Sequence, residues 1–376
     1  MKLAFCLFKY FPFGGLQRDF LRIAEACQRR GHSIDVFTTC WEGEVPAGFD
    51  VHLLPVSSLT NHGRSLAFGK ALSERLGVAA YDAVIGFNKL TGLDVYFAAD
   101  PCFAAKVRHK HGFLYRLSNR YRIYAALEKA VFGPESATEI LLISEVEKPH
   151  FIGHYGTAEN RFHALPPGIC RDRKAPDNPL QERNNFRREF GFSDAAQLLL
   201  MVGSGFKTKG LDRSIQALAA LPELTRKNAF LLVVGQGDAA PFLRLARKLG
   251  VDDHLKFYGG RNDVPRFLFG ADLLLQPSYY ENTGTAIVEA IVAGLPVLAT
   301  ANCGYAHYVT ESNAGLLAPE PFVQEQFNEL LLQMLTSSGR EAWRRSALDF
   351  ASRADLFSLP EKAADIIESV ALRSHR

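Results

Sequence analysis

This sequence has few cysteines, few long apolar runs and little net charge. Each of these features excludes a class of protein. Six of the 376 residues are Cys, with no CxxC pair among them. This excludes a disulfide-stapled small domain and a thiolate zinc site, and it indicates a reducing compartment. The uncharged run 290–310 contains Gly294, Pro296 and His307, so it does not predict a membrane span. The apolar start, residues 1–8, is too short for a signal peptide.

The overall charge is nearly balanced, but one segment is strongly basic. The chain has 43 Lys and Arg against 40 Asp and Glu, a net charge of +3. Within residues 103–132, seven cations face a single acid, Glu128, and six aromatic residues are interleaved with them. Cations mixed with aromatics favour contact with anionic lipid. The alternatives are a solvated surface helix and nucleic-acid binding, but no RNA or DNA motif accompanies the charge, so we expect no nucleic-acid partner.

Apolar strands alternate with amphipathic helical stretches, which is typical of α/β folds with parallel sheets. With 47% hydrophobic residues over this length, we expect two full-sized domains. Strands are predicted at 2–8, 33–38, 51–54, 83–87, 94–98, 140–144, 162–165, 198–202, 230–234, 255–258, 272–276 and 296–300. Helices are predicted at 16–30, 115–132, 210–220, 239–249, 285–293, 324–335, 340–351 and 359–372, and the polar stretch 171–188 as a linker. We therefore expect two doubly wound domains with a hinge near Gly168.

Three predicted strand-to-helix junctions are suited to binding phosphate. In open α/β sheets, ligands lie at the carboxyl ends of strands, where helix N-termini present free N–H groups. The junctions are 12–16 with Gly14-Gly15, 203–210 with two Lys, and 280–285 with Glu281. None matches GxGxxG or a Walker loop, and each taken alone is also compatible with a tight turn. Together they predict a site for a diphosphate joined to a polyhydroxylated group.

Two glutamates eight residues apart strengthen this prediction. Glu281 precedes the helix predicted at 285–293, and Glu289 lies inside it. A carboxylate accepts two hydrogen bonds from a vicinal diol, so one glutamate can hold a sugar and the other a ribose. Glu289 is flanked by apolar residues, where an idle charge would be costly.

The frame ENTGTAIVEAIVAGLPVLAT resembles the E-x7-E region of the retaining glycosyltransferases of family 4. Residues 202–210 and Gly14-Gly15 are similar to that family's Lys-Gly segment and first glycine loop. The segments KYFPFGGLQRDF, TNHGR, GLDVYFAAD, GFLYRLSNRYR, PPGI, GRNDV, CGYAHY and LPEKAADII resemble the heptose α-1,3-glucosyltransferases of the lipopolysaccharide core. The resemblance implies a GT-B fold with two Rossmann-like domains facing a cleft. It implies an acceptor domain, 1–168, joined by the returning helix 353–376, and a nucleotide-sugar domain, 169–352.

The resemblance also implies the roles of individual residues. Glu281 would hold the donor sugar, Glu289 the ribose, Lys209 the diphosphate, and Asp100, where the family usually has a His, would lie near the anomeric carbon. Asp19 would face the acceptor or the donor sugar. The remaining nucleotide-sugar residues would be Gly14, Gly15, Arg261, Asn262, Asn282, Thr283, Gly284 and Thr285. The family often has an Arg after the strand that ends at residue 202, but this chain has Gly203-Ser204, so we assign the second cation to Arg173, with Lys207 in reserve.

The implied reaction moves a hexose, most readily glucose, from a UDP-sugar to a heptose of the lipid-linked lipopolysaccharide core, without a metal or another cofactor. UDP-galactose, UDP-N-acetylglucosamine and UDP-N-acetylgalactosamine are alternative donors, and a UDP-sugar epimerase or a non-catalytic sugar-nucleotide-binding module is the alternative from another class. The resemblance places the enzyme at the cytoplasmic face of the inner membrane. There the cations Lys106, Arg108, Lys110, Arg116, Arg120 and Arg122 would contact anionic lipids.

Overall fold

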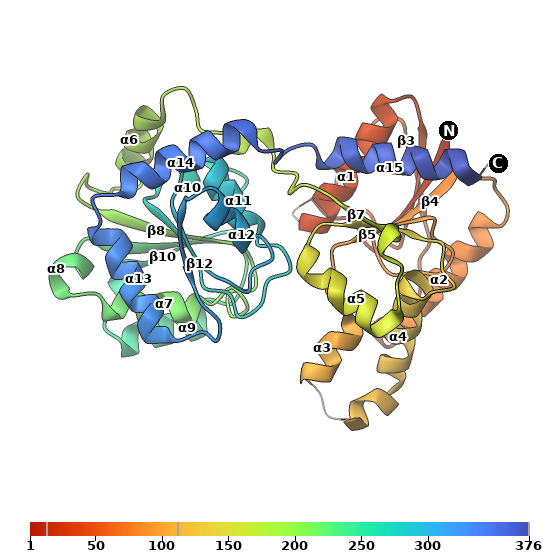
Figure 1. Ribbon diagram of the computed structural model, residues 1–376, viewed down its shortest axis with the longest axis horizontal. Helices are drawn as coiled ribbons and strands as arrows, with labels where there is room; N and C mark the ends of the chain where they lie inside the picture. Colours follow the sequence, from red (N-terminus) through yellow and green to blue (C-terminus); the bar gives the residue numbers. More distant parts are fainter. Residues whose placement is uncertain (13, 111–112, 375–376) are drawn as a thin grey trace. The chain divides into compact units, whose positions relative to one another are not determined.

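The computed structural model describes residues 1–12, 14–110 and 113–374, of which the side chains of residues 109, 110, 113 and 374 are not described. The chain divides into two compact units (Figure 1). Unit 1 comprises Met1–Gly168 and Phe357–Arg376, and unit 2 comprises Ile169–Leu356. The sequence had placed the return to the first domain at residue 353, where the last helix of unit 2 ends.

Unit 1 is built on a seven-stranded sheet in the order β3-β2-β1-β4-β5-β6-β7, with every recorded pair parallel. Its strands are β1 (Lys2–Cys6), β2 (Ser33–Thr38), β3 (Phe49–Leu53), β4 (Ala83–Gly86), β5 (Val95–Ala98), β6 (Glu139–Leu142) and β7 (Phe162–Ala164). Its helices are α1 (Gly15–Arg29), α2 (Asn61–Leu76), α3 (Phe103–Lys110), α4 (Asn119–Phe132), α5 (Lys148–Tyr155) and α15 (Leu359–Ser374), with short 3-10 turns η1 (Phe113–Leu117), η2 (Glu145–Glu147) and η3 (Glu159–Arg161).

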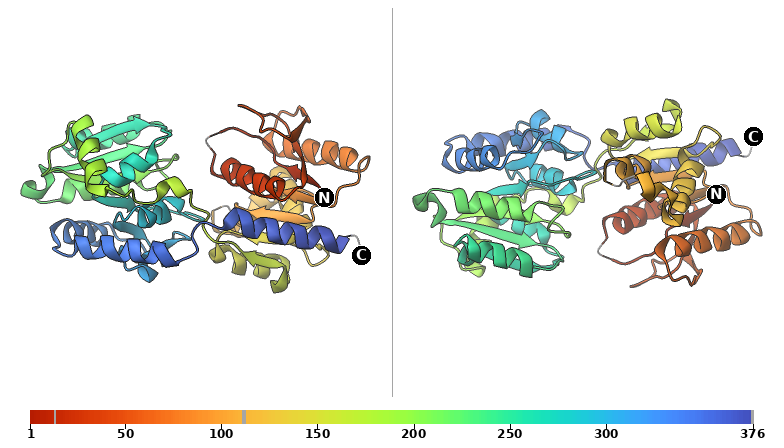
Figure 2. Two further views of the ribbon diagram at one scale, coloured as in Figure 1. Left: turned by 90° about the horizontal axis from the view of Figure 1, so that it is seen from above. Right: turned by 90° about the horizontal axis from the view of Figure 1, so that it is seen from below.

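Side chains that alternate along the strands of unit 1 pack into two hydrophobic cores, one on each face of the sheet. Leu3 and Phe5 pack with α1 and α15 on one face, whereas Ala4 and Cys6 pack with α2, α4 and α5 on the other. Strands that are buried on both faces carry near-continuous apolar runs, which is why these strands could be predicted from the sequence. Figures 1 and 2 show α15 beside α1, a contact that joins the end of the chain to its beginning.

Unit 2 repeats this plan with a six-stranded parallel sheet in the order β10-β9-β8-β11-β12-β13. Its strands are β8 (Gln197–Val202), β9 (Ala229–Val234), β10 (Leu255–Gly259), β11 (Leu273–Gln276), β12 (Val297–Thr300) and β13 (Gly315–Ala318). Its helices are α6 (Pro179–Glu189), α7 (Leu211–Ala220), α8 (Glu223–Arg226), α9 (Ala240–Lys248), α10 (Val264–Gly270), α11 (Thr285–Val292), α12 (Ala306–Glu311), α13 (Gln324–Thr336) and α14 (Arg340–Arg353), with 3-10 turns η4 (Arg171–Arg173) and η5 (Asp252–His254). Helices α7, α9 and α13 cover one face of the sheet, and α6, α10, α11, α12 and α14 cover the other.

The prediction of two Rossmann-like doubly wound α/β domains is therefore confirmed. Two local predictions were wrong. The stretch 171–188 is not a linker, because α6 begins at Pro179 and buries Phe186 in the core of unit 2. The helix predicted over 115–132 is divided at Ser118, whose hydroxyl accepts from the Tyr121 N–H and caps α4. Helices α2, α3, α5, α8, α10 and α12 and strand β13 were not predicted.

Each sheet has one point at which the strand order reverses. In unit 1 it lies between β1 and β4, and in unit 2 between β8 and β11. Loops that leave two neighbouring strands in opposite directions open a crevice at their carboxyl ends, which is where open α/β sheets bind ligands. The segments 203–210 and 277–284 are the two loops at this point in unit 2. Two of the three phosphate-binding junctions predicted from the sequence thus meet at one place.

Candidate functional site

The two loops at the switch point of unit 2 are in direct contact. The Tyr279 N–H donates to the carbonyl of Thr208 at 2.9 Å. Gly210 adopts φ +75°, and a Cβ built there would lie 1.9 Å from the carbonyl oxygen of Pro277. Only glycine combines this left-handed conformation with so close an approach of two backbones. Gly210 therefore lets the loop after β8 pack directly on the loop after β11.

This contact brings Lys209 and Glu281 together. The Lys209 ammonium lies 2.5 Å from Glu281 Oε2, and the two side chains are 17% and 18% exposed. A partly buried ammonium and carboxylate at the carboxyl edge of a parallel sheet are the groups that a diphosphate and a sugar diol require. Both residues were predicted for these roles, and the structure shows that they form an ion pair.

The backbone beyond Glu281 is fixed by its neighbours and leads into α11. The Gly304 N–H donates to the carbonyl of Glu281, and the Tyr305 N–H donates to the carbonyl of Thr283. Gly284 is the N-cap of α11 with φ +84°. The predicted donor-site segment Asn282, Thr283, Gly284 and Thr285 thus forms the N-terminus of a helix, where backbone N–H groups and the helix dipole favour an anion.

Cys303 carries a thiol and forms an isolated β-bridge with Glu281. Its side chain is 2% exposed. Burial raises the pKa of the Cys303 thiol to about 11. A buried thiol with a raised pKa has little thiolate character, so Cys303 is assigned no part in the chemistry.

Glu289 lies on α11 and is buried, as its apolar flanks indicated. Its partner is Arg173 in η4, whose Nε lies 3.3 Å from Glu289 Oε1. The residues are 6% and 7% exposed. Arg173 also contacts Asp172. The sequence assigned Arg173 to the diphosphate and Glu289 to the ribose as separate roles, but the structure joins them in one buried ion pair.

Arg261 and Asn262 lie in the loop between β10 and α10 and are both exposed. Arg261 makes two hydrogen bonds to Asp263, of 2.6 and 2.7 Å. These bonds raise the pKa of Arg261 and lower the pKa of Asp263. The planar guanidinium also lies 5.3 Å from the ring centre of Phe267. Asp263 therefore holds the Arg261 side chain beside Phe267, in the loop before α10.

Lys207, the reserve cation, is engaged elsewhere. Its ammonium lies 2.5 Å from Asp212 Oδ2 and 3.1 Å from the hydroxyl of Tyr279, which itself donates to Asp212. The hydrogen bond to Asp212 and then the one to Tyr279 raise the pKa of Lys207. Lys207 and Asp212, together with Phe206, Thr208 and Phe242, line a cavity of about 780 Å³ whose lining does not include Lys209 or Glu281. Sequence reasoning missed the Asp212–Tyr279 contact, because nothing local joins residues so far apart.

In unit 1, the predicted glycine loop opens α1. Gly14 is its N-cap, and the Gln17 side chain folds over it, since a Cβ at Gly14 would lie 1.8 Å from Gln17 Oε1. Gly15 is exposed, and a Cβ there would meet nothing within 4 Å. Asp19, one turn further along α1, has Oδ1 4.0 Å from Arg22 Nη1. The start of α1 is thus accessible to a ligand at Gly15.

Asp100 is exposed just beyond the carboxyl end of β5. In the sheet of unit 1, β5 is the second strand from β1, on the far side of β4. Asp100 therefore lies at the same edge of the sheet as the loop that carries Gly14 and Gly15.

The basic segment forms α3, η1 and α4, which project from the rest of unit 1 in Figure 1. Lys106, Arg108, Arg116, Arg120 and Arg122 are exposed. Lys110, also predicted to contact lipid, ends α3, and its side chain lies outside the described residues. Leu114 and Leu117 are 79% and 57% exposed between the cations. Among the described residues, no helix combines the length and apolar character needed to cross a bilayer.

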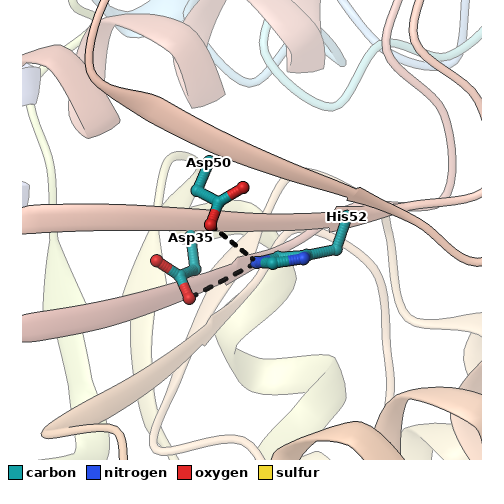
Figure 3. A group of neighbouring side chains, drawn as sticks. All are labelled: Asp35, Asp50 and His52. Carbon is teal, nitrogen blue, oxygen red and sulfur yellow. Dashed lines mark ion pairs between the residues drawn. The ribbon is translucent and has the colours of Figure 1, made fainter.

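Among the described residues, one group has spacing suited to a metal ion, and it lies away from these loops. Figure 3 shows Asp35 on β2 and Asp50 and His52 on the neighbouring edge strand β3. His52 Nε2 lies 3.4 Å from Asp35 and 3.5 Å from Asp50. Asp35 also binds the ammonium of Lys2 at 3.2 Å and the hydroxyl of Tyr81 at 2.6 Å. Because Asp35, which is 6% exposed, already binds Lys2 and Tyr81, the group is an ion-pair and hydrogen-bond network within the fold.

Comparisons with known proteins match both halves of the chain. The family described as glycosyl transferases group 1 matches residues 182–349, and glycosyltransferase family 4 matches residues 13–173. The lipopolysaccharide glucosyltransferase WaaG of Escherichia coli K12 is 51% identical over 368 residues, 98% of each chain. A crystal structure of WaaG has a TM-score of 0.92, covering 97% of this chain and 99% of that one. Anabaena HepE with UDP-glucose bound, at 19% identity, has a TM-score of 0.75 over 98% and 100% of the chains, a likeness of fold.

Proposed function

This chain belongs to glycosyltransferase family 4, and we propose that it transfers glucose from UDP-glucose to a heptose of the lipopolysaccharide inner core, in α-1,3 linkage with retention of configuration. It is a glycosyltransferase of the GT-B fold, as the resemblance implied. The acceptor is supported by the 51% identity to a lipopolysaccharide glucosyltransferase. The observation that carries the proposal is the Lys209–Glu281 pair at the switch point of unit 2, in front of the N-terminus of α11.

The proposed donor roles combine those that the family resemblance implied with the contacts described above. Glu281 takes the hydroxyls of the transferred sugar, and the backbone N–H groups of residues 282–285 take the phosphate oxygens beside it. Lys209 neutralises the diphosphate. Glu289 holds the ribose, and Arg173 keeps its carboxylate oriented through the buried ion pair. Arg261 and Asn262 border the uracil.

Residues of unit 1 complete the proposal. The N–H of Gly15 meets the diphosphate at the start of α1. Asp100 acts near the anomeric carbon, and Asp19 faces the acceptor or the donor sugar. Asp100 either stabilises positive charge on the sugar or forms a covalent adduct with it.

In the favoured mechanism, the bond between the anomeric carbon and the β-phosphate oxygen breaks, and negative charge develops on that oxygen. Lys209 and the N-terminus of α11 stabilise this charge, the work that a divalent cation performs in other transferases. The acceptor hydroxyl forms its bond to the anomeric carbon from the same face, and its proton passes to the departing phosphate. We therefore propose that no metal takes part.

The decisive experiment measures UDP release from UDP-glucose with and without a heptosylated core acceptor. UDP formation that depends on the acceptor, with equal rates in magnesium and in EDTA, is expected. Sugar interconversion without UDP release would identify an epimerase, and binding without either would identify a binding module. A competition between UDP-glucose, UDP-galactose and their two N-acetylamino forms decides the donor, a choice that contacts of only about 1–3 kcal/mol control.

We also propose that α3, η1 and α4 rest on anionic lipid at the cytoplasmic face of the inner membrane, which is where a lipid-linked acceptor is reached. Each cation near such a surface contributes about 1 kcal/mol, and the exposed Leu114 and Leu117 add apolar contact. Replacing Arg116, Arg120 and Arg122 by Glu should abolish sedimentation with anionic vesicles. The matched control replaces three exposed cations of α9, Arg244, Arg247 and Lys248, by Glu. Equal vesicle binding by both triple variants would contradict the proposal.

A further inference from the structure

The four residues that follow Asp100 are held by charged side chains from three separate elements. Lys89, in the loop after β4, donates to the carbonyl of residue 101 at 3.1 Å. Glu147, in η2, accepts from the N–H of residue 102 at 2.8 Å. Glu128, on α4, accepts from the N–H groups of residues 103 and 104 at 2.8 and 3.0 Å. The backbone is thus fixed at each of the four positions immediately beyond Asp100.

The two carboxylates among these side chains are buried, and Lys89 and Tyr155 both bind Glu128. Glu128 is 0% exposed and Glu147 is 4% exposed. The Lys89 ammonium lies 2.5 Å from Glu128 Oε1, and the hydroxyl of Tyr155 donates to Oε2 at 2.6 Å. The negative charge of Glu128 also raises the pKa of Tyr155, after the larger effect of burial. Burying two carboxylates is costly unless each is paired and hydrogen-bonded, so this cluster defines one geometry of the backbone.

Asp100 and Glu128 also act on one buried hydroxyl. Tyr96, on β5, is 0% exposed. Burial raises its pKa most, and the negative charges of Asp100 and Glu128 raise it further. The exposed carboxylate at the end of β5 and the buried carboxylate on α4 are therefore close enough to share an electrostatic environment.

The same cluster belongs to the basic helices. Glu128 projects from α4, whose exposed side carries Arg120 and Arg122. The two N–H groups that it accepts are the first two of α3, which carries Lys106 and Arg108. An anion at this helix N-terminus also complements its dipole. One carboxylate thus joins α4, the start of α3 and the segment next to Asp100.

We propose that Glu128, with Lys89 and Glu147, is a positioning residue that fixes Asp100 and couples it to the basic surface formed by α3, η1 and α4. Docking of these helices on anionic lipid then affects the position of Asp100, because a rigid, hydrogen-bonded connection joins the helices to the residues that follow it. This inference rests on the proposed roles of Asp100 and of the basic surface. It adds that transfer by Asp100 responds to the membrane, whereas donor binding by unit 2 does not.

The test compares Glu128→Gln with the wild type. The amide keeps the shape of the side chain but replaces one acceptor oxygen by a donor and leaves Lys89 without its carboxylate. The turnover number should fall about 10- to 100-fold, the size expected for a misplacement of up to 1 Å. The KM for UDP-glucose and the affinity for UDP should not change. Stimulation of turnover by anionic vesicles, measured as a ratio, should disappear.

Three further variants make the outcome decisive. Lys89→Met removes the contact to residue 101 and serves if Glu128→Gln does not fold; the same loss of turnover and of vesicle stimulation is expected. Tyr155→Phe leaves all four backbone contacts in place and should retain both. Asp100→Asn separates the two proposals: full activity of this variant would refute the role of Asp100 itself. Impaired Asp100→Asn beside wild-type turnover and vesicle stimulation in Glu128→Gln and Lys89→Met would overturn the positioning inference alone.

Discussion

A single methyl group at Gly210 should separate the two loops that carry Lys209 and Glu281. In Gly210→Ala, the added Cβ would start 1.9 Å from the carbonyl oxygen of Pro277, whereas real contacts of this kind are not shorter than 3.0 Å. Because the obstacle is backbone and not a flexible side chain, the loops must move apart by about 1 Å. That displacement lengthens the Lys209–Glu281 contact by a similar amount.

The expected loss of turnover is about 100-fold, since a misplacement of 1 Å in a catalytic arrangement has this effect. Stability should also fall, by roughly 1–2 kcal/mol for the left-handed conformation and about 1–3 kcal/mol for the overpacking. Turnover is measured as acceptor-dependent UDP release, and stability by denaturant unfolding of the same preparation.

Gly250→Ala is the matched control. Gly250 has φ +69°, but a Cβ there meets nothing within 4 Å, and it lies after α9, at the opposite edge of the sheet. This variant should lose only the roughly 1–2 kcal/mol of conformational strain and keep its turnover. If Gly210→Ala retains the turnover of Gly250→Ala, the close approach of the loops does not place the ion pair, and the reasoning is refuted.

Three more outcomes are expected. Lys209→Ala should lower turnover about 10²–10³-fold, the usual cost of removing one preorganised group that stabilises the leaving charge, with a smaller effect on the KM for UDP-glucose; a change in KM alone would contradict this role. Glu289→Ala should weaken UDP binding in calorimetry and cost about 3–5 kcal/mol of unfolding free energy, because Arg173 is left buried without its partner; unchanged UDP affinity would remove Glu289 from the ribose site. Burial favours a higher pKa for Asp35, but hydrogen bonds from Tyr81 and Lys2 outweigh it and lower the pKa below 3.8, so Asp35 stabilises the fold above that pH and loses this effect as the pH falls through its lowered value. Asp35→Asn should therefore be less stable than the wild type at pH 7, with a difference that shrinks in acid; a difference independent of pH would exclude this cause.

The strands and the burial of Glu289 could be predicted because they depend on local patterns. Apolar runs such as 198–202 and the apolar flanks of Glu289 are visible in the sequence itself. The pairing of Lys209 with Glu281 could not be predicted, because the two residues are 72 positions apart and meet only when β8 and β11 become neighbours. Resemblance to a family supplied their roles, but not their contact.

The errors have physical causes as well. Helix α6 is rich in charges, and its few apolar residues, among them Phe186, were too sparse to show the helical period. The break at Ser118 depends on its hydroxyl accepting a hydrogen bond from a backbone N–H, which residue composition does not reveal. The residues around Glu128 were described as part of a charged surface, although among the charged side chains of that segment that the structure describes, this acid is the one that the fold buries completely.

In the proposed donor site, Lys209 and Glu281 would each bind a different half of the donor, and the ion pair between them occupies both groups. An intact nucleotide sugar offers an anion to the lysine and hydroxyls to the glutamate, so it replaces both lost contacts at once. The nucleotide product would still bind Lys209, but it has no sugar hydroxyls to bind Glu281. Re-formation of the ion pair would then compete with the bound product, which favours product release and leaves the enzyme ready for the next cycle.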